Sequence, residues 1–274
     1  MALLAMQIIT GTIPVAQAYP PAPYHLIYGT VRDRYGTPLT SAQAQIVLQT
    51  STGVQLSAFV LPGFSPGINY QIKVPMDAGQ TPDLYQANAL FAAATFKMLV
   101  VIAGVTNLPI EMALTNAVLG QPGKTTRLDL TLGVDSNGDG IPDAWENAFL
   151  ATIGATNTLA SLTAQTMFGG RTLLQQYLLG TYPFDPGNPL RVVLLGANSN
   201  ATVLQFPTIT GRAYTVQGSA DAITWTAAAF TLDSDAPGSP SRAFYYASGI
   251  ASVQANVVPP PAGTPKQFYR IMVQ

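Results

Sequence analysis

The amino-acid sequence predicts a mainly β protein, with two β-sandwich domains joined by a short helical segment. Three observations lead to this fold class. Short runs of alternating apolar and polar residues recur in both halves of the chain. The 274 residues include 24 glycines and 22 prolines, which separate these runs as turns. Between the two halves, one stretch changes to the spacing of apolar residues that is typical of a helix.

We expect the chain to divide into four parts. Residues 1–18 read as a signal peptide or an apolar N-terminal arm, and residues 19–133 as the first β-sandwich. Residues 134–189 hold a loop and two short helices, and residues 190–274 form the second β-sandwich. A turn-rich run at 182–189 marks the last boundary.

The first 18 residues bear on the compartment. The run from Met1 to Val15 is mostly apolar, and Ala16-Gln17-Ala18 has the small-x-small pattern that signal peptidase cuts. No lysine or arginine precedes the apolar run, so two readings stay open: cleavage near Ala18 during export, or retention as an apolar arm or strand used in assembly. The run is too short to span a bilayer. We expect a secreted or cell-surface protein without a membrane span in the mature chain.

Strand candidates with turn boundaries follow one another through the first sandwich. They are residues 25–31, 45–49, 54–61, 70–74, 96–103 and 125–132. Residues 87–96 are rich in alanine and predict a short helix. In the last strand, 125–132, the leucines are expected to face inward and Arg127, Asp129 and Thr131 outward.

The second, smaller sandwich is predicted from the same kind of pattern after the boundary at 182–189. Its strand candidates are residues 191–195, 203–206, 214–217 and 268–273. Each is rich in β-branched or aromatic residues, as strands that pack on a core require.

The stretch 135–146, between the two sandwiches, carries oxygen-bearing side chains at the spacing of a calcium loop. Loop positions 1, 3, 5, 9 and 12 are Asp135, Asn137, Asp139, Asp143 and Glu146. Gly140 holds position 6, where the chain must turn sharply, and Ile141 at position 7 offers its backbone carbonyl. The chain has no cysteine and no histidine near this stretch, so Ca²⁺ is the metal expected.

Two short helices are expected after the calcium loop begins. Pro142 suits a first helical turn, and residues 143–152 carry Trp145 and Phe149 at helical spacing. A second helix is expected over 172–179, with Gly180 at its end. The pair is too small to fold without metal or a neighbouring domain, so we expect Trp145 to pack rather than to bind a ligand.

Composition excludes several classes of function. The net charge is −1 and only 9% of residues are charged, so the chain has no electrostatic footprint for nucleic acid. The single histidine, His25, lies at the start of a strand, which gives a Ser-His-Asp triad little support. No glycine-rich phosphate cradle precedes a helix. We therefore expect no enzyme, no catalytic residues and no nucleic-acid partner.

Several stretches together resemble a family of modular bacterial exported proteins. Residues 135–146, with the core Gly-Asp-Gly-Ile-Pro-Asp-Ala-Trp-Glu, look like a thrombospondin type 3-like calcium repeat. Such repeats often continue to a Tyr-Leu-x-Gly-Thr-x-Pro element, seen here at 177–183. Residues 204–225 and the closing 268–270 are similar to the small β-sandwich that accompanies these repeats. Residues 29–39 are similar to the opening of carboxypeptidase regulatory-like, transthyretin-type sandwiches.

This resemblance implies an extracellular or surface location, calcium-dependent rigidity and no catalytic residues. The chain departs from the family in a degenerate second loop, where Gly170 aligns with Gly140. The ligand positions of that second loop hold Gln165, Met167, Gly169 and Leu173, which cannot bind calcium. One bound calcium is therefore expected.

A structural or adhesive surface module is the function we expect, with calcium stiffening the junction between the two sandwiches. Its partners would be other surface proteins, itself or glycans. Two alternatives stay open: self-assembly into a filament or surface layer by strand addition, and carbohydrate binding. The second would use Trp225, Tyr245 and Tyr246 as a stacking platform.

Overall fold

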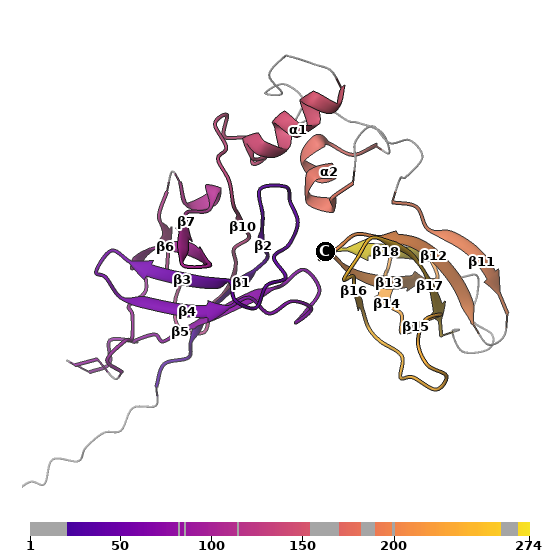
Figure 1. Ribbon diagram of the computed structural model, residues 1–274. Coiled ribbons are helices and arrows are strands. Elements are labelled where there is room, and N and C mark those ends of the chain that lie inside the picture. Colours follow the sequence, from indigo (N-terminus) through magenta and orange to yellow (C-terminus); the bar gives the residue numbers. More distant parts are fainter. Residues whose placement is uncertain are drawn as a thin grey trace, which may run out of the picture.

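The computed structural model describes residues 21–81, 83–84, 86–113, 115–153, 170–181, 190–198, 201–258 and 268–274. It is mainly β, as the sequence predicts. In Figure 1 the strands form two groups, and helices α1 (Asp143–Ile153) and α2 (Leu173–Leu179) lie at the top, between the groups. The predicted signal segment 1–18 and the boundary run 182–189 lie outside the described residues.

The first group of strands contains three sheets. In one, β1 (His25–Gly29) pairs antiparallel with β5 (Tyr70–Val74) and parallel with β9 (Thr125–Arg127). A short parallel pair, β2 (Val31–Arg32) with β10 (Leu130–Thr131), follows β1 and β9 along the chain. The third sheet has the order β4-β3-β6-β7, with β8 also paired to β6; its strands are β3 (Gln45–Thr50), β4 (Gln55–Phe59), β6 (Thr95–Ile102), β7 (Val105–Asn107) and β8 (Ala117–Val118).

One apolar core joins these three sheets. It contains Ile27, Ile46, Leu48, Tyr70, Ile72, Met98, Val100 and Leu130, all of them buried. Burial alternates along β3 and β5 because successive side chains of a strand point to opposite faces. Each large apolar side chain buried in this way contributes about 1.5–3 kcal/mol to the stability of the fold. The core thus fixes where β9 and β10 run, and these strands lead into the predicted calcium loop.

Two expectations for this first group are wrong. The alanine-rich stretch 87–96 is not helical: Leu90 exchanges backbone hydrogen bonds with Pro75 and Asp77, and β6 begins at Thr95. Pairing with a distant segment here outweighs the helical preference of alanine. Thr131 does not face outward but is buried, and its backbone N–H donates to the Glu111 carboxylate at 2.8 Å.

The second group of strands contains two sheets. One has the order β11-β12-β17-β15, from β11 (Val193–Ala197), β12 (Thr202–Thr208), β17 (Ala251–Val257) and β15 (Phe230–Leu232). In the other, β13 (Ala213–Ser219) pairs with β14 (Thr226–Ala227), β16 (Tyr245–Tyr246) and β18 (Phe268–Val273). A second core, with Leu204, Phe206, Tyr214, Val216, Phe230 and Val257, draws on both sheets. The two groups of strands therefore have separate cores.

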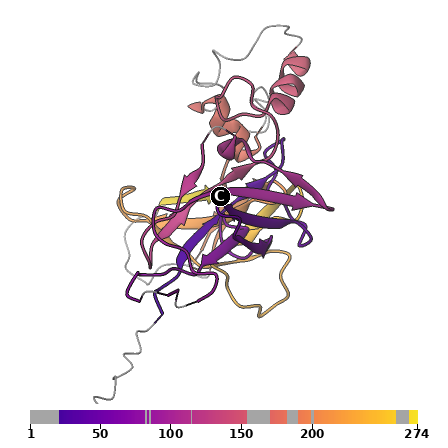
Figure 2. The same ribbon diagram turned by 90° about the vertical axis from the view of Figure 1, so that its left-hand side faces the viewer.

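Both helices end close to where the sequence predicts. The Thr172 side chain accepts from the Gln175 N–H, the Gln175 side chain accepts from the Thr172 N–H, and Gly180 ends α2 with φ 72°. In the side view of Figure 2 the helices lie at one end of the molecule, beyond the sheets. Neither helix in the described part of the chain has the length and apolar content needed to cross a membrane.

Candidate metal centre

The predicted calcium loop, residues 135–146, connects β10 to α1. The Leu132 N–H donates to the Arg32 carbonyl, which keeps the chain paired with β2 up to the residue before Gly133. At the other end, the Asp143 N–H donates to the Val134 carbonyl at 2.7 Å and closes the loop. The loop is thus held at its first end by the sheets of the first core and at its second end by a helix.

Asp135, at loop position 1, curls the chain around its carboxylate. Its Oδ1 accepts from the Gly138 N–H at 2.8 Å and from the Asp139 N–H at 3.3 Å. Its Oδ2 accepts from the Gly140 N–H at 2.9 Å. Gly140 has φ 88°, which glycine adopts readily and other residues do not, and this explains the glycine at loop position 6.

Asn137, at loop position 3, brings positions 5 and 12 together. Its Nδ2 donates to Asp139 Oδ2 at 3.1 Å and to Glu146 Oε1 at 3.2 Å. Glu146 lies in the first turn of α1 and is 8% exposed. Burial raises the pKa of Glu146, and the nearby Asp139 charge raises it further. Three of the predicted ligands therefore meet at one point, where the negative charges of Asp139 and Glu146 repel each other.

The carboxylate of Asp143, at loop position 9, is bonded to Ser136 and not to the other predicted ligands. Asp143 Oδ1 accepts from the Ser136 N–H at 2.8 Å, and Oδ2 accepts from the Ser136 hydroxyl at 2.6 Å. These two bonds lower the pKa of Asp143. In calcium loops position 9 often acts through a water molecule, a role that a carboxylate held by Ser136 still fits. At position 7, the Ile141 side chain is fully buried and its N–H donates to Asp139 Oδ1 at 2.9 Å.

The donor set fits a hard cation after one change. As the side chains lie, no group of three or more carboxylates or imidazoles among the described residues is arranged to hold a metal ion. The Asn137 amide nitrogen, bonded to Asp139 and Glu146, lies between their oxygens. A half-turn of the amide would exchange Nδ2 for Oδ1 and present oxygens of three side chains to the same point, but it would break the hydrogen bond that Oδ1 accepts from the Asp139 N–H at 3.0 Å. Such an all-oxygen set is what Ca²⁺ prefers.

The loop is joined to α2 through aromatic packing. Trp145 stacks on Phe149 with ring centroids 5.2 Å apart and meets Tyr177 edge-on at 5.5 Å. Ile141, Phe149, Leu173 and Tyr177 form a third, small core at this place. Trp145 therefore packs in this small core, as predicted, and its contact with Tyr177 joins the start of α1 to α2.

Arg212 is an important residue of this region that sequence reasoning missed. It lies between β12 and β13 and is 2% exposed. Its Nη2 donates to the Gly36 carbonyl at 2.6 Å and to the Leu178 carbonyl at 3.2 Å. Arg212 thus connects the second strand group to the first and to α2. No sequence signal indicated this, because Gly211-Arg212 reads as an ordinary solvated turn.

The two strand groups also meet directly through glycines. A side chain at any of three positions would press on the other group: Gly63 on Tyr246, Gly67 on Gln274, and Gly211 on Pro38. At Gly211 an added Cβ would lie 3.1 Å from the Pro38 carbonyl oxygen. These close approaches bring both groups of strands and α2 to one junction beside the loop.

The three aromatic residues of the carbohydrate-binding alternative, Trp225, Tyr245 and Tyr246, do not lie together. Trp225 adjoins β14 and Tyr245 lies in β16, and these strands pair with opposite ends of β13, about 13 Å apart at the usual rise per residue. Arg270 covers the Trp225 ring at 4.3 Å. The ring of Tyr246 lies against Gly63, at the contact between the two strand groups. The three rings therefore do not form one surface.

Comparisons of the chain with protein-family models, with curated proteins and with solved structures found no match.

Proposed function

We propose that this chain is a non-enzymatic structural or adhesive module, secreted or at the cell surface, in which calcium stiffens the junction between two β-sandwiches. One observation carries the proposal. Glu146, the last ligand position of the loop, lies on α1 next to Trp145, which packs on Tyr177 of α2. The predicted calcium loop is thus connected to the second group of strands through α2 and Arg212, and Arg212 also bonds to Gly36 of the first group.

Electrostatics gives calcium its effect in this proposal. Asp135, Asp139, Asp143 and Glu146 place four carboxylates within twelve residues of chain. A divalent cation between them replaces repulsion with attraction, so the loop and the start of α1 become more rigid. Extracellular calcium modules have dissociation constants of roughly 0.1–1 mM. At about 1 mM calcium, a dissociation constant of about 0.1 mM stabilises the folded chain by about 1.4 kcal/mol.

Thermal unfolding in calcium and in chelator tests this proposal. We expect about 1 mM calcium to raise the melting temperature of the wild type by about 3–5 °C. In Asp139→Ala the rise should disappear because one ligand is gone. Asp233→Ala, which removes an exposed carboxylate outside the loop, is the matched control and should keep the rise. An unresponsive wild type, or an equal response in Asp139→Ala, would rule out a calcium site in this loop.

Self-assembly is a second candidate function, and β11 favours it. This strand lies at the edge of its sheet and exposes three large apolar side chains, Val193, Leu194 and Leu195. An apolar edge strand offers unpaired backbone groups to a strand from another chain. Electron microscopy and sedimentation of the wild type and Leu194→Lys test this function. Filaments or oligomers that the lysine abolishes would support it, and a wild type that stays monomeric at high concentration would exclude it.

A further inference from the structure

A cavity of about 360 Å³ lies where the three parts of the chain meet. Its lining comes from the turn after β2, from α1, from the end of α2 and from the second strand group. The residues that matter to the argument are Tyr35, Thr37, Trp145, Phe149, Thr181 and Arg212. Cavities of about 300–1,000 Å³ are typical of sites for small organic ligands.

Arg212 gives this cavity a buried positive charge. The ion pairs among the described residues join Arg32 and Arg127 to Asp129, and Arg242 to Asp235, and none involves Arg212. Its hydrogen-bond partners are the uncharged carbonyls of Gly36, Leu178 and Thr210, so no carboxylate is in direct contact with the guanidinium. Buried charges are normally paired with an opposite charge, so this guanidinium favours an anion.

Hydrogen-bonding capacity remains on the same guanidinium. An arginine has five N–H donors, and the three carbonyl contacts of Arg212 use three of them. Burial, together with repulsion from Arg32, lowers the pKa of Arg212 to about 10, so the group is still charged at neutral pH. The nearby Asp33 charge acts in the opposite direction and raises the pKa of Arg212, but Asp33 forms no ion pair with Arg212, and its Oδ1 accepts from the Tyr35 and Thr37 N–H groups.

Aromatic rings form the apolar part of the lining. Trp145 and Phe149 stack on each other and line the cavity from α1, and Tyr35 lines it from the turn after β2. Arg34 lies over the Tyr35 ring at 5.0 Å and adds a second positive charge near this wall. Flat apolar groups stack favourably on such rings.

We propose that this cavity binds a small aromatic carboxylate, with the carboxylate on Arg212 and the ring against Tyr35 and Trp145. The site adjoins the predicted calcium loop, because Trp145 directly precedes Glu146 in α1. The proposal assigns a ligand site at the junction, in addition to the stiffening role proposed for the loop.

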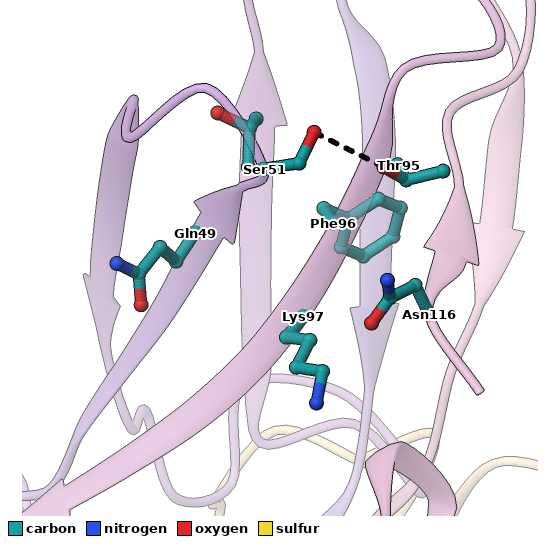
Figure 3. Close-up of a pocket in the computed structure, with 7 residues that line it drawn as sticks. Gln49, Ser51, Thr95, Phe96, Lys97 and Asn116 are labelled. Carbon is teal, nitrogen blue, oxygen red and sulfur yellow. Dashed lines mark hydrogen bonds between the residues drawn. The ribbon is translucent and has the colours of Figure 1, made fainter. Parts of the chain in front are cut away.

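A second pocket differs from the junction cavity in the exposure of its positive charge. A pocket of about 140 Å³ lies beside β3 and β6. Figure 3 shows Lys97, Gln49 and Asn116 among its lining residues. Thr95 donates a hydrogen bond to Ser51 across it at 3.2 Å. The one cation among its lining residues, Lys97, is exposed to solvent, which screens its charge. The junction cavity differs in having its charge buried.

Tryptophan fluorescence provides the test. In Trp225→Phe, Trp145 is the only tryptophan and reports on the cavity. In about 1 mM calcium, we expect benzoate to quench this signal in a saturable manner. Benzamide, its neutral analogue of the same shape, should bind at least tenfold more weakly, because a charged hydrogen bond is lost. Equal binding of the two compounds, or no binding of benzoate, would overturn the proposal.

Two substitutions in the Trp225→Phe background locate the site. Arg212→Gln should weaken benzoate binding at least tenfold, whereas Arg191→Gln, which removes an exposed arginine, should leave it unchanged. Tyr35 is 47% exposed, so Tyr35→Ala should keep the fold and weaken binding roughly three- to tenfold. If Arg212→Gln fails to fold, Tyr35→Ala and the comparison with benzamide decide. Wild-type affinity in Tyr35→Ala or in folded Arg212→Gln would contradict the proposed site.

Discussion

The only histidine of the chain has structural contacts on both ring nitrogens. His25 is 1% exposed, and its Nδ1 accepts from the Gly120 N–H at 3.1 Å. Its Nε2 therefore carries the proton and donates to Thr126 Oγ1 at 2.8 Å. Both contacts join β1 to chain about one hundred residues later. Protonation of Nδ1 would break the bond to Gly120.

These contacts predict a specific pH dependence. Burial and the Lys124 charge lower the pKa of His25 below its usual 6.5, so the unfolded chain binds this proton more readily than the folded chain. The contribution of His25 to stability is complete above about pH 7.5 and decreases as the pH falls through about 6.5. Melting temperatures of the wild type and His25→Gln between pH 5 and 8 should converge toward low pH. A constant difference between the two proteins would contradict this.

The side chain of Asn69 forms three hydrogen bonds with distant backbone groups, which no local sequence pattern indicates. Its Oδ1 accepts from the Val31 N–H at 2.7 Å, and its Nδ2 donates to the carbonyls of Val31 and Leu39. The amide thus takes the place of a strand beside β2, just before the turn that reaches Arg212. Sequence patterns treat such a residue as part of a polar turn, because its partners lie 30 to 38 positions away.

Among the elements, α2 depends on Gly180 for two reasons. The residue has φ 72°, and an added Cβ would lie 2.9 Å from Arg212 Cζ. Gly53 is a matched control, because it has φ 89° but nothing within 4 Å of an added Cβ. We expect Gly53→Ala to lower the free energy of unfolding by about 1–2 kcal/mol and Gly180→Ala by more.

Urea unfolding of four proteins separates the two causes. In an Arg212→Gln background, the excess cost of Gly180→Ala over Gly53→Ala should shrink, since the guanidinium that it meets is gone. If Gly180→Ala and Gly53→Ala lower the free energy of unfolding equally in the wild-type background, the Arg212 side chain moves aside without loss of stability. The end of α2 would then not depend on close packing against the second strand group.

At the scale of the whole molecule, two large cores share a junction that contains only the small third core and the buried Arg212. Calcium removal should therefore loosen the junction without unfolding either core. Hydrogen exchange with and without chelator measures this: exchange should accelerate in residues 134–153 and 170–181 and stay unchanged in β3, β6, β12 and β17. Asp139→Ala in calcium should behave like the chelated wild type. Faster exchange throughout both cores would instead make calcium a requirement of the fold.

Local features of this protein could be predicted from its sequence. Strand periodicity located β3, β5 and β18 closely, and Gly180 located the end of α2. In the loop at residues 135–146, Asn137 bonds to Asp139 and Glu146, whereas the calcium ligation that the spacing predicts stays a prediction. Each of these features depends on residues within about a dozen positions of one another, and the local geometry of the backbone relates them directly.

Only the tertiary structure decided which distant segments meet. Residues 87–96, predicted as a helix, form turns and strand pairing instead. Thr131 is buried, and Trp225 lies far from Tyr245. Arg212 is also buried, and its contact with Gly36 spans 176 positions. Periodicity and spacing describe one segment at a time, whereas the junction and its cavity arise from the packing of three segments whose mutual positions no local pattern encodes.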